Sequence, residues 1–231
     1  MGSTIKPLLL HAHHNGPNPL KIAIALEFLQ VPYTIRLWEG GDDPEKGVKG
    51  TAFLKINENG RVPALEDPNT GVTSWESGAV MNYLRRVYDR DNKIGPRGDT
   101  EQDLVDLEKW EYLLLTTLGP MSGQCNWFRV TLDRFHNKTK NEDALERYQG
   151  QTLRCYDILE GQLKKTNGAT IIPGGYTSAD CHYEPWIRLH GFAGLTLDNH
   201  PLIAKWFQAF GETKEVKAAY GRIKEAAEQQ A

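Results

Sequence analysis

The sequence contains few cysteines: three of 231 residues, Cys125, Cys155 and Cys181. They are far apart, and none forms a Cys-x-x-Cys pair or a cysteine–histidine cluster with zinc-like spacing. A disulfide framework and a structural zinc site both depend on such groupings. We therefore expect three reduced thiols, no metal and a reducing compartment.

Long apolar runs and an excess of basic residues are also missing. No run approaches the roughly 18 apolar residues of a membrane-spanning helix. The first apolar stretch, residues 7–10, stops at His11 and is too short for a signal peptide. The formal net charge is −3, whereas nucleic acids and anionic membranes attract basic surfaces. We expect a cytoplasmic protein that binds neither nucleic acid nor membrane.

The composition is otherwise that of a globular protein, with 39% hydrophobic and 25% charged residues. Asn18 followed by Pro19 is a favourable helix start, so a helix is expected from near Asn18 to Leu29. The other elements expected in this part are strands at 8–11, 33–38, 62–66 and 72–75, a short helix before the third strand, and a helix at 76–90. This order predicts a mixed sheet with a parallel first pair and an antiparallel hairpin.

Beyond a polar linker the pattern is helical almost throughout. The expected helices are 104–118, ended by Gly119-Pro120, and then 145–163, 177–192, 200–210 and 213–227. Thr177 and Asp180 fit a capping box at the start of one of them. The expected organisation is an α/β domain at 5–92, a linker at 93–99 and an all-helical domain at 100–231.

Two short segments have unusual backbone chemistry. A cis Val62–Pro63 bond at the start of a strand would turn the N–H and C=O of Val62 away from their own sheet, where an extended peptide could pair with them. Glu76 and Ser77 stand where a strand gives way to a helix, whose first N–H groups and positive potential suit a carboxylate. Glu76 could hold an amine in the same place. Together these groups suit a small peptide with an amine and a carboxylate at one end.

The same segments resemble the thioredoxin-like domain of cytosolic glutathione transferases. The matching pieces, in order, are Pro17-Asn18-Pro19-Leu20-Lys21-Ile22, Val62-Pro63-Ala64-Leu65 and Glu76-Ser77-Gly78-Ala79-Val80. The helical remainder resembles the family's second domain, with Thr177-Ser178-Ala179-Asp180 at its capping box. The likeness covers nearly the whole chain and is closest to the fungal and bacterial nu-like branch, related to the yeast prion-forming nitrogen regulator. It implies a thioredoxin-like N-terminal domain with a mixed four-stranded sheet, followed by an all-helical C-terminal domain.

The resemblance also implies a glutathione site. Val62, with Pro63, would pair with the cysteinyl part of glutathione. Glu76 and Ser77 would hold the amine and carboxylate of the γ-glutamyl part. The glycyl carboxylate needs a cation from the loop before the third strand, and Lys49 is the candidate unless it only faces solvent. The alternatives to Lys49 are two neighbouring lysines, Lys46 and Lys55.

The usual catalytic hydroxyl or thiol of the family is missing. No Ser, Thr, Tyr or Cys lies between His11 and Leu20, and Gly16 replaces the serine of several plant-type and fungal members. The nu-like branch is thought to use an asparagine, matched here by Asn18, with Asn15 as a substitute. An amide N–H would stabilise the thiolate over the thiol. Asn18 could instead only cap the helix.

Two further groups are candidates for the site: histidines near this loop, and aromatic and polar residues in the helical part. His11, His13 and His14 have no local acidic or thiol partner, so they do not indicate a metal site, although His13 or His14 near the thiol remains an alternative. The co-substrate pocket is expected at the first helices of the second domain. Its candidate lining residues, which could equally be core, are Tyr112, Thr116, Trp127, Phe128 and Arg129.

The function that the resemblance implies is that of a glutathione transferase. The enzyme would direct the thiolate of glutathione, a co-substrate, at a small electrophilic or disulfide-bearing molecule, and it would act as a cytoplasmic homodimer without a covalent enzyme intermediate. Two alternatives remain: a glutathione-dependent disulfide reductase or peroxidase, and a non-catalytic glutathione-binding regulator. Whether the role is detoxification or biosynthesis is left open.

Overall fold

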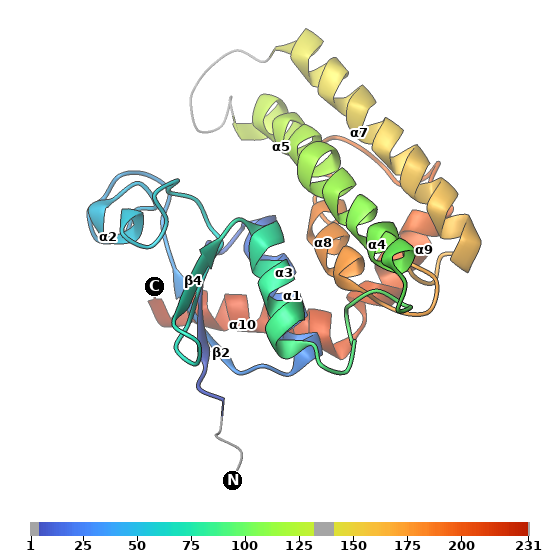
Figure 1. The fold of residues 1–231 in the computed structure, drawn as a ribbon. Helices are drawn as coiled ribbons and strands as arrows, with labels where there is room; N and C mark the ends of the chain where they lie inside the picture. Colours follow the sequence, from blue (N-terminus) through green and yellow to red (C-terminus); the bar gives the residue numbers. More distant parts are fainter. Residues whose placement is uncertain (1–4, 132–140, 231) are drawn as a thin grey trace. The chain divides into compact units, whose positions relative to one another are not determined.

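The structure, a computed structural model, describes residues 5–131 and 141–230 (Figure 1). The chain forms two compact units, the first reaching to Ile94 and resuming at Thr213, and the second running from Gly95 to Glu212. The division expected from the sequence placed the last helix in the helical domain. In the structure this helix belongs to the first unit.

The first unit has the predicted mixed four-stranded sheet. Its elements are β1 (Leu8–Ala12), α1 (Pro17–Leu29), β2 (Tyr33–Leu37), α2 (Thr51–Leu54), β3 (Ala64–Asp67), β4 (Val72–Trp75), α3 (Ser77–Tyr88) and α10 (Lys214–Gln230). The strand order is β2-β1-β3-β4. β1 is parallel to β2 and antiparallel to β3, and β3 is antiparallel to β4. The expected α/β fold is therefore confirmed.

Helix α1 is buried on nearly all sides. Every residue from Pro19 to Leu26 is buried, because α1 packs against β1, α3 and α10. Figure 1 shows α1 and α3 on the same side of the sheet. A smaller apolar cluster joins Phe53 of α2 to Trp38 and Ala64. Helix α1 is thus packed on several sides by other elements of the first unit.

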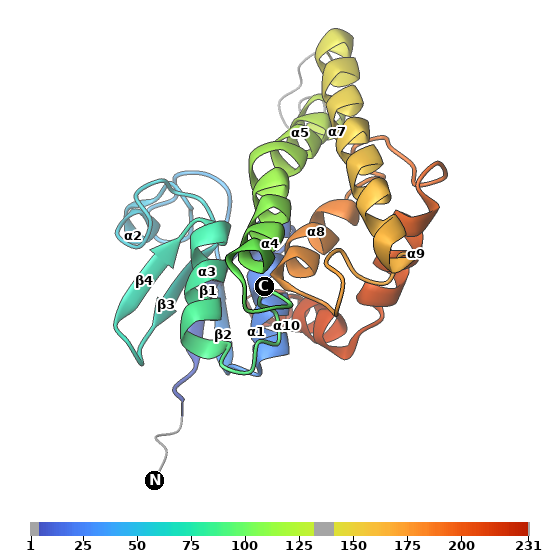
Figure 2. The ribbon, with the colours of Figure 1, turned by 45° about the vertical axis from the view of Figure 1, so that its right-hand side comes forward.

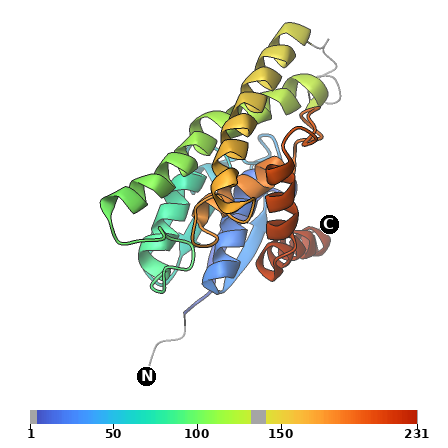
Figure 3. The same cartoon turned by 90° about the vertical axis from the view of Figure 1, so that its right-hand side faces the viewer.

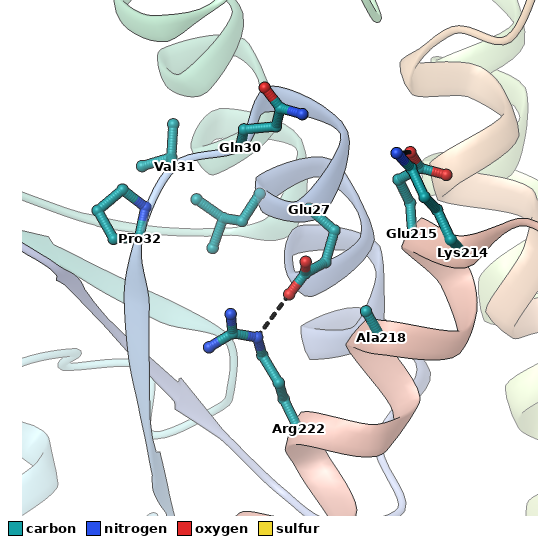
Figure 4. A pocket seen from close by; sticks show the side chains of 9 residues that line it. Glu27, Gln30, Val31, Pro32, Lys214, Glu215, Ala218 and Arg222 are labelled. Carbon is teal, nitrogen blue, oxygen red and sulfur yellow. Dashed lines mark ion pairs between the residues drawn. The ribbon is translucent and has the colours of Figure 1, made fainter.

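Helix α10 is fixed to the end of α1 by a partly buried ion pair. The Arg222 guanidinium donates to the Glu27 carboxylate at 2.7 Å (Figure 4). The Tyr33 hydroxyl donates to the same carboxylate at 2.8 Å, and the Arg222 guanidinium lies 4.7 Å from the centre of the Tyr33 ring. Gln30 and Lys214 line a cavity of about 460 Å³ beside this pair. These contacts explain why the last helix joins the α/β unit.

The regular elements described in the second unit are all helices, joined by turns and loops. Its elements are α4 (Glu101–Leu113), the π-helical turn η1 (Leu114–Leu118), α5 (Gly119–Asn126), a second π-helical turn η2 (Trp127–Thr131), α7 (Glu142–Leu163), the 3₁₀ turn η3 (Lys164–Thr166), α8 (Ser178–Ile187) and α9 (Pro201–Gly211). α5 and α7 pack side by side, as Figures 1 and 2 show. This arrangement confirms the expected all-helical second region.

The expected helix end at Gly119-Pro120 is wrong. The helix continues from α4 through η1 into α5, a run that Figure 3 shows without a break. In the π-helical turn the Gly119 N–H donates to the C=O of Leu114, five residues back. Pro120 is then the second residue of α5, directly after the π-helical turn. A change of hydrogen-bond register therefore carries the chain past the proline.

Thr177 and Asp180 form the predicted capping box of α8. The Asp180 carboxylate accepts the Thr177 N–H at 2.8 Å, the Ile171 N–H at 3.1 Å and the Trp206 indole N–H at 2.7 Å. Burial raises its pKa, although these bonds oppose the effect. The three cysteines are buried, and no disulfide joins them in the described structure. No helix in the described residues has the length and apolar character to cross a bilayer.

Candidate functional site

Three chain segments meet at one edge of the sheet. His11 at the end of β1 lies opposite Ala64 at the start of β3, and Ala64 lies opposite Trp75 at the end of β4. Since both pairs are antiparallel, the segments after β1, before β3 and after β4 lie at the same edge. These segments carry the predicted site residues Asn15, Asn18, Val62, Pro63, Glu76 and Ser77. Residues separated by about sixty positions in the sequence are therefore gathered in one place.

Asn18 lies in the first turn of α1 and does not cap it. The helix begins at Pro17 with Gly16 as the N-cap, so the capping interpretation of Asn18 is wrong. Pro17 and Pro19 have no N–H, and the Gly16 N–H donates to His13 C=O at 3.2 Å. Among the first three helical residues, only Asn18 thus has a main-chain N–H. Half-buried Asn18 combines this donor with its side-chain amide at the positive end of a helix.

Asn15 has a different setting. Its side chain is exposed, and its amide nitrogen lies 2.7 Å from Nε2 of His14. Its main-chain N–H donates to Nδ1 of His13 at 3.3 Å. Burial and the neighbouring His14 lower the pKa of His13, which favours its neutral form. The described residues contain no group of three metal-ligating side chains.

Val62 and Pro63 are joined by a cis peptide bond. Val62 is half-buried and packs against the Trp38–Phe53–Ala64 cluster. It lies two residues before Ala64, the first residue of β3. In the described part of the chain, the main-chain N–H and C=O of Val62 form no hydrogen bond with another loop or turn. Its peptide groups therefore lie at the edge of the sheet, outside the β3 ladder.

Glu76 and Ser77 form the junction between β4 and α3. Glu76 is exposed and has φ 67° and ψ 117°. A positive φ is unusual for a residue with a Cβ, and such strained positions gather at ligand sites. Ser77, the first residue of α3, is buried. The junction thus places a carboxylate, a hydroxyl and the N-terminus of a helix together.

A buried cation, Lys21, lies behind this junction, and the sequence reasoning missed it. The Lys21 side chain is fully buried, and its Nζ donates to Ser77 Oγ at 3.4 Å. Burial lowers the pKa of Lys21 to about 7, and the Glu76 carboxylate opposes this shift. The available signal was a single charge within the apolar stretch from Leu20 to Leu26. That stretch was interpreted only as an apolar helix.

A second buried ionisable group, His11, lies at the end of β1. Its Nδ1 accepts the Trp38 indole N–H at 3.0 Å, and its Nε2 lies 2.7 Å from the Glu66 carboxylate. An acceptor at Nδ1 and a donor at Nε2 define one neutral tautomer. Burial lowers the pKa of His11 despite Glu66. His11 therefore supports the sheet edge and is not a metal ligand in this arrangement.

The three candidate lysines have different surroundings. Lys49 is exposed, and its Nζ donates to Asn59 C=O at 2.8 Å, in the turn that leads to Val62. Lys46 lines a cavity of about 570 Å³. That cavity is also lined by His14, Arg36, Leu37, Trp38, Glu39, Glu45, Ala227 and Gln230. Lys55 follows the end of α2 and is exposed. Of the three, Lys49 is tied to the segment that carries Val62.

The residues expected to line the co-substrate pocket differ in their surroundings: some are exposed, and others contact neighbouring residues of the helical unit. Tyr112 and Trp127 are exposed. Phe128 instead stacks on Tyr148, with ring centres 5.7 Å apart. Arg129 donates to the C=O of Gly191 and of Phe192, each at 3.1 Å. Phe128 and Arg129 thus have structural contacts within the helical unit.

Comparisons with known proteins identify the family of this chain. Residues 16–87 match the glutathione S-transferase N-terminal domain, and residues 114–213 match the C-terminal domain. The glutathione S-transferase-like protein tpcF of Aspergillus fumigatus is 32% identical over 87% of this chain and 89% of its own length. Glutathione S-transferase 2 of Schizosaccharomyces pombe is 31% identical over 95% of this chain and 97% of its own.

Solved structures with bound glutathione are similar over almost the whole chain. The glutathione transferase URE2P6 of Phanerochaete chrysosporium, in complex with oxidized glutathione, has a TM-score of 0.82 and 31% identity. The match covers 96% of this chain and 98% of that chain. A glutathione transferase homolog of Lodderomyces elongisporus, with two GSH per subunit, has a TM-score of 0.82 and 27% identity over 94% and 99% of the two chains.

Proposed function

The chain belongs to the glutathione S-transferase family, and we propose that it is an active glutathione transferase that stabilises the thiolate of bound glutathione. The observation that carries this proposal is the pairing of His11, Ala64 and Trp75 across three strands. This pairing brings three groups to one end of the sheet. They are the N-terminus of α1, the peptide groups of Val62 before β3, and the Glu76 carboxylate with the Ser77 hydroxyl. Those are the groups that a tripeptide with a thiol and an amino-acid end requires.

The tripeptide would lie along the edge in an extended form. Its cysteinyl part pairs with the N–H and C=O of Val62, which Pro63 holds outside the sheet. Glu76 and Ser77 hold the γ-glutamyl amine and carboxylate. Lys49 is the partner of the glycyl carboxylate, and its bond to the Asn59 C=O leaves two N–H donors on the ammonium.

The thiol would lie at the start of α1, with Asn18 as the activating residue. A free thiol titrates near 8.5, so only about 3% is thiolate at pH 7. Lowering the pKa by about two units requires roughly 2.7 kcal/mol of preferential stabilisation. A hydrogen bond to a charged acceptor supplies about 1.5–3 kcal/mol, and a helix N-terminus about 0.3–1 kcal/mol more. Asn18 ranks above Asn15 because Asn18 is half-buried in the first turn of α1, whereas Asn15 is exposed in the loop before the helix.

The enzyme would need no covalent intermediate of its own. The thiolate is the nucleophile, and catalysis follows from its stabilisation and from its position beside a small electrophilic or disulfide co-substrate. We further propose a homodimer, a cytoplasmic location and glutathione as the one co-substrate that all reactions share, without a metal. The helical unit would hold the second substrate.

Disulfide reduction is a second candidate activity. The observation that favours it is the oxidized glutathione bound by the URE2P6 relative, since oxidized glutathione is itself a disulfide. A thiolate held at the same helix start would attack a sulfur atom of the disulfide and release the other sulfur as a thiolate. The binding site would be unchanged, and only the second substrate would differ.

A substrate panel separates these activities. Glutathione affinity is first measured by calorimetry, and turnover is then followed with a chloro-nitroaromatic electrophile, a small organic disulfide and an organic hydroperoxide. Conjugation of the electrophile supports the transferase, whereas turnover of the disulfide or hydroperoxide alone supports the reductase or peroxidase. Binding without any turnover contradicts both and supports a non-catalytic regulator.

A further inference from the structure

The buried cation Lys21 connects the two helix starts of the candidate site. Lys21 follows Asn18 by three positions on α1, so the two residues are neighbours along one side of the helix. Its Nζ donates to Ser77 Oγ, the hydroxyl of the first residue of α3, at 3.4 Å. The side chain is fully buried. An amine that can carry a positive charge is therefore buried directly behind the junction of β4 and α3.

This position is unfavourable for a cation in the absence of an anion. A helix N-terminus carries positive potential and stabilises negative groups, whereas cations are favoured at the C-terminus. Burial of the ammonium adds a desolvation cost, which lowers the pKa of Lys21 to about 7. The Glu76 carboxylate, which is exposed, opposes this shift only in part. An additional negative charge bound at the junction would stabilise both the helix start and the ammonium.

We propose that Lys21 is a positioning residue that orients the Ser77 hydroxyl and supplies buried positive charge for the α-carboxylate of the γ-glutamyl group. This inference rests on the proposed glutathione site and adds to it a residue that need not touch the ligand. With Lys21 donating to its oxygen, the Ser77 hydroxyl is free to direct its own proton at the carboxylate. An aliphatic side chain of similar length would fill the same space without either effect.

The test compares two ligands that differ only in this carboxylate. Glutathione and its decarboxylated analogue, γ-aminobutyryl-cysteinylglycine, are titrated by calorimetry into the wild type, Lys21→Met and Ser77→Ala. Lys224→Met is the control, because the Lys224 side chain is 79% exposed on α10. Circular dichroism confirms that each variant is folded.

The expected result is specific to the ligand. Lys21→Met weakens glutathione binding at least about tenfold, as expected for the loss of a charge-assisted interaction, and leaves the affinity for the analogue unchanged. Ser77→Ala, which keeps the lysine, weakens glutathione binding but also spares the analogue. Lys224→Met binds both ligands as the wild type does.

Three outcomes contradict the inference in different ways. Equal weakening of both ligands by Lys21→Met would mean that the lysine only supports the fold. An unchanged glutathione affinity would mean that its charge does not reach the carboxylate. If Lys21→Met does not fold, the Ser77→Ala comparison decides, and equal weakening of both ligands there overturns the inference. A wild type that does not bind glutathione would overturn the proposed function itself.

Discussion

The indole N–H of Trp38 donates to Nδ1 of His11 at 3.0 Å and so fixes the proton of the neutral imidazole on Nε2, which faces Glu66. Burial lowers the pKa of His11 in the folded protein. The unfolded chain therefore takes up a proton near pH 6.5, before the folded protein does. The contribution of this neutral imidazole to stability is present above pH 6.5 and is lost as the pH falls through the folded pKa.

His11→Gln tests this assignment. A glutamine can accept from Trp38 and donate to Glu66 without titrating. We expect the free energy of unfolding of the wild type to fall more steeply between pH 7 and pH 5 than that of His11→Gln, measured by urea denaturation at each pH. Parallel curves for the two proteins would mean that His11 titrates in the folded state as it does in the unfolded chain.

Lys21 gives a second dependence on pH, in the alkaline range. Its pKa is lowered to about 7 in the folded protein, from 10.5 in the unfolded chain, so the unfolded state binds more protons between these values. The free energy of unfolding therefore rises with pH across this range. We expect the difference in free energy of unfolding, wild type minus Lys21→Met, to increase by about 2 kcal/mol between pH 7.5 and pH 9. Chemical denaturation at each pH measures this difference. A difference that stays constant with pH would contradict the lowered pKa.

The capping boxes of α4 and α8 allow a matched comparison of burial. Asp180 is fully buried and accepts the Thr177, Ile171 and Trp206 N–H groups. Asp103 occupies the same position in the exposed box of α4, where it accepts the Thr100 N–H at 3.0 Å. We expect Asp180→Ala to lower the free energy of unfolding by about 3 kcal/mol or more, because it leaves buried donors unsatisfied. Asp103→Ala should lower the free energy of unfolding by about 1 kcal/mol. Urea denaturation measures both variants, and an equal loss of stability in the two would contradict the role assigned to burial.

Local sequence signals predicted most of the fold. Hydrophobic spacing and turn residues predicted the four strands in their order along the chain. Thr177 and Asp180 marked the start of α8. The continuation through Gly119-Pro120 was not predictable in this way, because it depends on a π-helical turn that changes the hydrogen-bond register. The position of α10 beside α1 was missed for a related reason. Its contacts, such as Arg222 with Glu27, join residues nearly two hundred positions apart.

The candidate site shows the same division between local and long-range information. Val62-Pro63 and Glu76-Ser77 were recognisable from the sequence as short motifs. Lys21 was not recognised, because a lysine in an apolar helix has no local signature that separates a buried ammonium from one that reaches solvent. Only the packing of α1 against α3 shows that this lysine faces Ser77. The assignment of Asn18 to the helix start also depended on whether Gly16 or Asn18 caps α1.

The central claim is that the start of α1 makes the thiol of bound glutathione more acidic. Its most direct test is a titration of the thiolate absorbance of glutathione bound to the wild type, to Asn18→Ala and to Asn15→Ala. We predict a bound-thiol pKa about two units below the value near 8.5 of a free thiol in the wild type and in Asn15→Ala, and a return toward that value in Asn18→Ala. A wild-type complex whose thiol titrates like free glutathione would contradict the account.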